Sequence, residues 1–304
     1  MVHVARAWLL VAAATAVIGI AAYAAWRMHR QPQSATSPSA TRVIHGIPIG
    51  AVVIDTPHYR IHSSASADHA AEVGQALESL HAAYAALFPI ATDPGRLPVI
   101  LYRDRAEFSR NNRSSPWAEA YYLDPACYAY FDAAARNPHH WAMHEAVHQL
   151  ARKASGFKRN RWIDEGLASY FSASRRVDGR LQPGNIDSTA YPAWWLADAA
   201  GKRKMPIPLE VLLSNGSGPA VDTHFNQYYL SAWSLTHFLL HRDNGRHASA
   251  YRAFLEAGAD RNAFLRHIGP IETIESQWIQ YFRRQAQEAT KRQLEDTPTI
   301  SIGD

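Results

Sequence analysis

Short apolar stretches separated by turn residues fill the first half of the chain, a pattern typical of β-strands. Residues 97–102 form a continuous apolar run of the buried type, and Asp124-Pro125 separates two stretches that we expect to pair as a hairpin. The predicted strands are 52–55, 59–62, 97–102, 118–123 and 126–132. Between the second and third of them, residues 67–88 place apolar side chains at spacings of three and four, which predicts a helix.

The second half has helical periodicity, with Gly, Pro and Asn residues between the segments. Helices are predicted at 138–152, from about 164 onward, and at 191–200, 206–213, 226–241, 248–257 and 271–291. Because the strands come early and the helices late, we expect an α+β fold. Its parts would be a small N-terminal mixed sheet with helices and a helical C-terminal half.

The N-terminal segment differs from the rest. Residues 7–26 are an apolar run without a charged side chain, just long enough to span a bilayer. Ala22-Tyr23-Ala24 also offers a small-residue cleavage site, so a signal peptide removed with residues 1–24 is the alternative. We expect either a single-pass anchor in the bacterial inner membrane, with the following domain in the periplasm, or secretion into the periplasm. Arginines on both sides of the run leave the orientation open.

Residues 27–42 are rich in Pro, Ser, Thr and Ala and predict a flexible linker that cannot bury a core. The folded domain is then expected over 43–296, and a frayed tail over 297–304. A domain tethered in this way is more typical of an envelope protein than of a cytosolic enzyme.

Composition narrows the possible partners. With 304 residues, 47% of them hydrophobic, the chain can form one sizeable domain. The net charge is +4, but no basic run is dense enough to predict a nucleic-acid face. Cys127 is the only cysteine, so no disulfide partner exists within the chain.

His144-Glu145-Ala146-Val147-His148 is the strongest chemical signal. On a helix, residues four apart lie on one face, so both imidazoles can reach a single ion. Glu145 lies beside that face, where it can act on a water at the metal. Zinc suits this arrangement, since three protein ligands and an open position lower the pKa of bound water toward neutrality.

A third ligand is predicted downstream. Trp162-Ile-Asp-Glu-Gly-Leu-Ala-Ser-Tyr-Phe171 would begin a second helix with Glu165 in its first turn. Two His and one Glu are the ligand set of a catalytic zinc, and we expect one Zn²⁺ per chain. His139 and His140 are out of register with the other two imidazoles, so we interpret them as first-turn residues.

These two segments resemble the gluzincin metallopeptidases. The segment around Glu165 is similar to the Trp-Leu-Asn-Glu-Gly-Phe-Ala-x-Tyr segment of the neutral zinc aminopeptidases. The layout as a whole, over about residues 50–285, most resembles the bacterial peptidase MA-like group. The resemblance implies a zincin-like fold, zinc held by His144, His148 and Glu165, and Glu145 as the general base.

Two departures from that pattern matter. No Gly-x-Met-x-Asn motif precedes the zinc helix, so the aminopeptidases' anchor for a free amine is missing. In the thermolysin-like branch an Asp follows the third ligand by four residues, where this chain has Ser169. The orientation of a His ligand must therefore come from another residue.

The resemblance also implies an oxyanion donor and a substrate platform. The helix around Trp233 is similar to one in the peptidase MA-like group whose tyrosine aligns with Tyr229, with Tyr228 and His224 as rivals. The strand over 126–132 stands where gluzincins carry the edge strand that pairs with extended substrate.

The sequence therefore predicts a zinc metallopeptidase acting on peptides or proteins at the cell envelope. Without the amine anchor, an endopeptidase-type site is expected rather than a general aminopeptidase. Two alternatives stay open: a membrane-tethered interaction or assembly protein that keeps the zinc fold without turnover, and a zinc amidase acting on cell-wall material.

Overall fold

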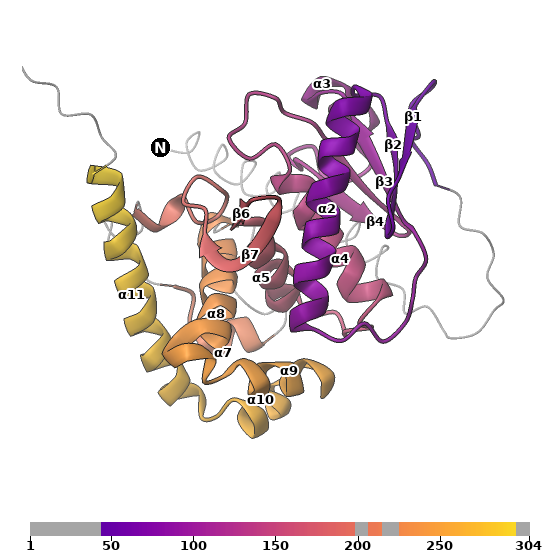
Figure 1. The fold of residues 1–304 in the computed structure, drawn as a ribbon. Helices are drawn as coiled ribbons and strands as arrows, with labels where there is room; N and C mark the ends of the chain where they lie inside the picture. Colours follow the sequence, from indigo (N-terminus) through magenta and orange to yellow (C-terminus); the bar gives the residue numbers. More distant parts are fainter. Residues whose placement is uncertain (1–43, 198–205, 215–224, 296–304) are drawn as a thin grey trace, which may run out of the picture. The chain divides into compact units, whose positions relative to one another are not determined.

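A five-stranded mixed sheet forms the N-terminal part of the computed structural model, which describes residues 44–197, 206–214 and 225–295 (Figure 1). Its order is β1-β2-β3-β5-β4. The strands are β1 Val52–Asp55, β2 Tyr59–Ser63, β3 Leu97–Tyr102, β4 Tyr121–Leu123 and β5 Ala126–Tyr130. The inner pairs β2–β3 and β3–β5 are parallel, and the outer pairs β1–β2 and β4–β5 are antiparallel.

Alternate residues of the inner strands enter two separate apolar clusters. Val99, Leu101 and Cys127 face the main core, while Ile100 and Tyr128 face a smaller cluster of aromatic side chains. With both faces covered, every residue of β5 is buried. This explains why the inner strands have continuous apolar sequences.

The position of the hairpin corrects one expectation. The hairpin itself forms as predicted, with Leu123 opposite Ala126. Its second strand, β5, pairs with β3 as well as with β4, so the strand over 126–132 is not an edge strand. The edge is β4. Strand order within a sheet depends on long-range pairing, which the local pattern does not contain.

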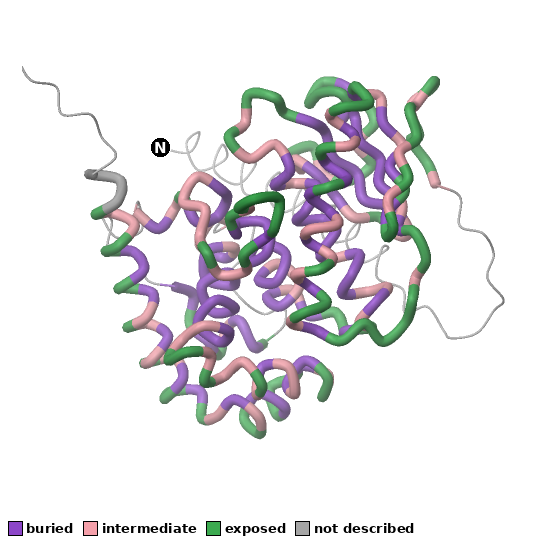
Figure 2. The backbone as a smooth tube through the Cα atoms, viewed as in Figure 1, coloured by how far each residue is buried: buried purple, intermediate pink, exposed green. Residues whose placement is uncertain are grey.

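Helices pack against the sheet and form most of the remaining described chain. They are α2 Ala67–Leu87, α3 Arg105–Asn111, α4 His140–Lys153, α5 Arg161–Ser172, α7 Leu209–Leu213, α8 Phe225–Gly245, α9 Ala248–Glu256, α10 Arg261–His267 and α11 Ile271–Glu295. Helix α2 begins where the Ser66 side chain accepts a hydrogen bond from the His69 N–H, which satisfies an N-terminal backbone donor. Figure 2 shows mostly buried residues along α4, α5 and α8.

A second hairpin, β6 Ser174–Val177 with β7 Arg180–Ile186, follows α5. The sequence analysis missed it because its strands are polar and lack a clear apolar alternation. One local signal was present. Asp178 and Gly179 both have positive φ, 49° and 75°, as a two-residue hairpin turn requires.

The predicted α+β architecture is confirmed: a mixed N-terminal sheet, a helix carrying His144, Glu145 and His148, and a helical C-terminal half. The predicted anchor or signal peptide over 1–26, the linker over 27–42 and the tail over 297–304 lie outside the described residues. Within the described ranges, no helix is both long and apolar enough to cross a membrane.

Candidate metal centre

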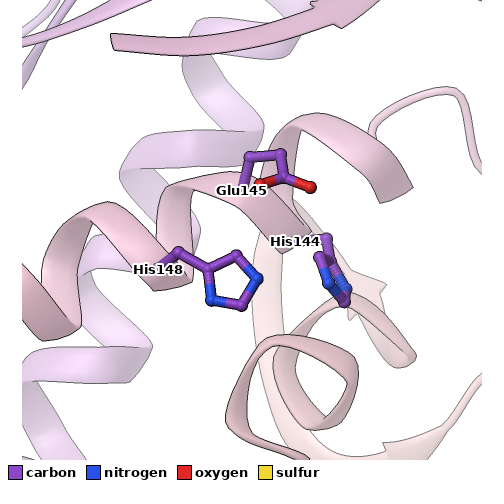
Figure 3. A group of neighbouring side chains, drawn as sticks. All are labelled: His144, Glu145 and His148. Carbon is purple, nitrogen blue, oxygen red and sulfur yellow. The ribbon is translucent and has the colours of Figure 1, made fainter. Parts of the chain in front are cut away.

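Helix α4 brings His144, Glu145 and His148 together (Figure 3). One potential ligand atom from each residue lies within 4.8 Å of the others. His144 and Glu145 are buried, and His148 is partly exposed. The group can hold a metal ion, because neutral imidazole nitrogens and a carboxylate oxygen are common zinc ligands.

A second carboxylate reaches the same two imidazoles from α5. Oε2 of Glu165 lies 3.3 Å from Nε2 of His144 and 3.7 Å from Nε2 of His148. The two helices are joined at this level by an ion pair between Arg152 of α4 and Asp164 of α5. Arg152 also donates to the Phe157 carbonyl oxygen over 2.8 Å, which ties the connecting loop to α4.

His144 and Glu165 shift each other's pKa in opposite directions. Burial alone would lower the pKa of His144, but the hydrogen bond that it donates to Glu165 and the charges of Glu165 and Glu145 raise it. Burial would raise the pKa of Glu165, but contacts with both imidazoles and with Tyr229 lower it to about 2. Without a metal, the site therefore favours a protonated imidazole beside an ionised carboxylate, and a cation can replace that proton.

Glu145 has a different environment. Burial raises its pKa to about 7, against the opposing effects of His144 and of a hydrogen bond from the Tyr122 backbone N–H. Tyr122 belongs to the edge strand β4. This contact could not be predicted from the sequence, because a backbone donor has no residue-type signature.

Tyr229 of α8 lies against the same group. Its ring is stacked near His144, with 6.2 Å between centroids. Its hydroxyl hydrogen-bonds with the Glu165 carboxylate. Tyr228 instead lies beneath the Arg161 guanidinium, 5.6 Å from the ring centroid. The third candidate, His224, is outside the described residues.

His139 and His140 lie at the start of α4 and contact other partners. His139 precedes the helix, and its Nε2 is 3.2 Å from a carboxylate oxygen of Glu72. Nδ1 of His140 is 3.1 Å from the Ser172 carbonyl oxygen. Burial lowers the pKa of His140 to about 4, so this side chain is neutral near pH 7.

Aromatic side chains extend from the centre to the surface. Trp141 lies 6.1 Å from the His144 ring and 5.9 Å from Tyr191, centroid to centroid. Tyr191 in turn lies 5.6 Å from Tyr229. The imidazole of His144 is therefore flanked by rings on more than one side.

The row continues outward from Tyr229. Phe225 lies 4.5 Å from Tyr229, and Trp117 lies 5.2 Å from Phe225, measured between ring centroids. Trp117 is 59% exposed, and Trp194, beside Tyr191, is 53% exposed. Exposed tryptophans next to a buried polar centre are unusual on a protein surface and suit contact with a ligand.

Comparison with known proteins finds that part of the chain is similar to a family whose function is unknown. Residues 141–258 match a family model described as "Protein of unknown function (DUF1570)". No curated protein matches the chain.

The region that matches DUF1570 begins inside α4 and ends just after α9. It therefore contains His144, Glu145, His148, Glu165 and Tyr229, all the residues that the sequence predicted for the site. The five-stranded sheet lies outside it. The match thus covers the candidate metal centre. The description of the family names no chemistry for it.

Proposed function

We propose that this protein is a zinc-dependent metallopeptidase of the gluzincin type. The observation that carries the proposal is the position of Glu165, whose Oε2 faces Nε2 of both His144 and His148 at 3.3 and 3.7 Å. A third ligand contributed by a separate helix is what a catalytic zinc requires in addition to two imidazoles.

Glu165, rather than Glu145, is the proposed carboxylate ligand. Its pKa is lowered, so it is ionised whenever the imidazoles can bind a metal. Glu145 has its pKa raised to about 7 and accepts a hydrogen bond from Tyr122. A carboxylate that can both hold and release a proton near neutrality is suited to be a general base.

The donor set fits zinc, with the buried imidazole of His144, the partly exposed imidazole of His148 and the carboxylate of Glu165 at a single point. A zinc ion held there would supply a Lewis acid that makes a water acidic near pH 7. Glu145 would accept the proton of that water and deliver it to the leaving amine. The Tyr229 hydroxyl would turn from Glu165 to donate to the oxyanion that develops on the scissile carbonyl.

The edge strand β4 supports a peptide as the substrate. It is one of the two outer strands of the sheet, and it contacts Glu145 through the Tyr122 N–H. An extended chain laid along an edge strand forms backbone hydrogen bonds without requiring particular side chains. β4 thus takes the role that the sequence analysis gave to the strand over 126–132.

The test combines metal content with turnover. Purified protein should contain about one zinc per chain and should cleave an unstructured substrate such as casein. Glu145→Gln should keep the zinc and lose hydrolysis by several orders of magnitude, because only the base is removed. Glu72→Gln, which changes a carboxylate outside the centre, should behave as the parent protein does.

Four outcomes would contradict the proposal. If stoichiometric zinc survives in the double variant His144→Ala, His148→Ala, the ligands are wrong. Casein turnover unchanged by Glu145→Gln would mean that the base lies elsewhere. Zinc binding with no turnover of peptides, but with release of cell-wall amides, would indicate the amidase instead, and no turnover of either would indicate an interaction protein.

A further inference from the structure

Helices α4 and α5 pack side by side, and three buried polar atoms lie on this pair of helices. Glu165 and Ser172 of α5 contact His144 and His140 of α4, at 3.3 and 3.1 Å, so the helices run antiparallel here. Ser169 lies one turn from each of these two contacts on α5 and is fully buried. The Oγ of Ser169, Nδ1 of His144 and Nε2 of His140 have no hydrogen-bond partner among the described residues.

Buried polar atoms are rarely left unsatisfied, because each loses its hydrogen bonds to water on folding. Three such atoms on one pair of helices therefore call for an explanation. The rings of His140 and His144 have centroids 6.3 Å apart, a separation that a hydroxyl group or one water can bridge.

The hydrogens on the two imidazoles are complementary. A carbonyl oxygen only accepts hydrogen bonds, so the contact with Ser172 places the hydrogen of His140 on Nδ1 and leaves Nε2 as an acceptor. Nε2 of His144 points to Glu165 and must be unprotonated to bind a metal, so its hydrogen lies on Nδ1, which is a donor. His144 thus offers a donor and His140 an acceptor, and a hydroxyl such as that of Ser169 can pair with both.

We propose that Ser169 and His140 are positioning residues for the metal ligand His144. The His144 Nδ1–H donates toward the Ser169 hydroxyl, and that hydroxyl donates toward Nε2 of His140. Buried water bridges both steps, because the side chains make neither hydrogen bond directly. Every member then has a partner of the right polarity. The inference rests on the proposed zinc site, because it assigns His144 Nε2 to the metal.

Ser169 also stands at a position where this chain departs from the thermolysin-like pattern. At the position of Ser169 the thermolysin-like branch has an Asp, which accepts from the ligand's other nitrogen. A carboxylate here would also face Nε2 of His140, which is itself an acceptor, and the two would repel. A hydroxyl both accepts and donates, so Ser169 and His140 form a matched pair.

Zinc affinity tests the proposal, with a matched control on the same helix. Ser169→Ala should weaken zinc binding by about 10- to 100-fold in a competition with a chelator, the usual effect of losing an outer hydrogen-bond partner. Ser172→Ala makes the same change at another buried serine one turn away. Its hydroxyl contacts only the Ser169 carbonyl oxygen, at 3.5 Å, so zinc affinity should stay within about twofold.

A second measurement separates positioning from packing. In protein loaded with Co²⁺, the Nδ1 proton of a ligand imidazole gives a shifted NMR signal whose exchange with water can be timed. This proton of His144 should exchange slowly in the parent protein and in Ser172→Ala. It should exchange at least tenfold faster in Ser169→Ala and in His140→Phe.

The outcomes are distinct. If the parent protein binds no zinc, the proposed function fails. If it binds zinc and Ser169→Ala matches Ser172→Ala in both zinc affinity and proton exchange, the positioning role of Ser169 and His140 is wrong, and the zinc site is unaffected.

Discussion

Two carboxylates lie beside the same pair of imidazoles, and their surroundings shift their pKa values in opposite directions. Burial raises the pKa of Glu145 to about 7, while hydrogen bonds and imidazole charges lower that of Glu165 to about 2. Sites that separate an acid–base group from a permanently charged one commonly show this division. It supports the roles proposed for the two residues.

Tyr229 gives the sharpest prediction at the scale of a single residue. Tyr229→Phe keeps the ring beside His144 and removes only the hydroxyl. We expect kcat on a peptide substrate to fall by about 10²- to 10³-fold with zinc content unchanged, because a donor to the oxyanion is lost. Tyr228→Phe, at the neighbouring position, should leave kcat nearly unaltered. Equal effects of the two changes would contradict the assignment.

The residues of the site differ in how far the sequence alone could predict them. His144, His148 and Glu165 stand in segments whose spacing indicates one centre, and the structure does bring them together. Tyr229 was predicted only from resemblance, and it lies against His144. The partners of His140 and Ser169 depend on the register between α4 and α5, which no local pattern contains.

At the scale of elements, α5 is held between α4 and α8, and its close approach to α8 depends on Gly166. A Cβ added to Gly166 would lie 2.8 Å from the Ala232 carbonyl oxygen and would also meet Thr236. Backbone atoms of a packed helix cannot move aside easily, so glycine is required at this contact.

Gly166→Ala is therefore expected to lower the free energy of unfolding by about 1 to 3 kcal/mol, measured with urea. It should also weaken zinc binding, since Glu165 is the adjacent residue and moves with the helix. Gly74→Ala in α2 is the matched control. There a Cβ would meet only side-chain tips, Thr56 Cγ2 at 3.0 Å and Ile61 Cδ1 at 3.2 Å, so stability should change little. A stable Gly166→Ala variant with full zinc affinity would contradict this account.

Glu107 of α3 links the helix to the ends of β2 and β3. Ser64 donates to its carboxylate over 2.6 Å, and the Arg103 N–H over 3.0 Å. Burial alone would raise the pKa of Glu107, but these bonds and the Arg103 guanidinium lower it to about 2. A lowered pKa means that the ionised form stabilises the fold above the ordinary value of about 4.5.

That stabilisation should be lost as the pH falls from about 4.5 toward 2. In Glu107→Gln, the free energy of unfolding should fall less over this range, by about 1 to 2 kcal/mol, because one titrating group is removed. Urea unfolding at a series of pH values measures the difference. Parallel pH profiles for the two proteins would contradict the assigned pKa.

The elements themselves were largely predictable, but the strand order was not. Apolar runs and helical spacing indicate β3, α2, α4 and α8 from local sequence. The outer position of β4 follows from pairing between β3 and β5, segments separated by α3 and β4 in the chain. The hairpin β6–β7 was missed because its side chains are polar, although its Asp-Gly turn could have indicated it.

At the scale of the whole molecule, the first prediction concerns the cellular location of the site. We propose that residues 7–26 hold the protein at the cytoplasmic membrane with the metal centre in the periplasm. A C-terminal fusion to a reporter that is active only outside the cytoplasm should then be active. Activity of a cytoplasm-only reporter at the same position would reverse the orientation.

The choice of substrate is the second prediction at this scale. The sequence between 118 and 138 has no Gly-x-Met-x-Asn anchor for a free amine, and β4 can pair with the middle of an extended chain. Without that anchor, a charged amine would lose hydration near the buried centre with little in return. Peptides with an acetylated N-terminus should therefore be cleaved at least as well as their free counterparts. Efficient release of single N-terminal residues, abolished by acetylation, would indicate an aminopeptidase.

The closeness of Trp141 to His144 gives the centre an optical signal of its own. An indole 6.1 Å from a ligand ring is near enough to transfer its excitation energy to a coloured ion such as Co²⁺ or Cu²⁺. Filling the centre with such an ion should dim the emission of Trp141, whereas colourless Zn²⁺ should restore it. The chain has nine tryptophans, so the Trp141→Phe protein supplies the background emission. Metal exchange in this protein can thus be followed by fluorescence, without any substrate.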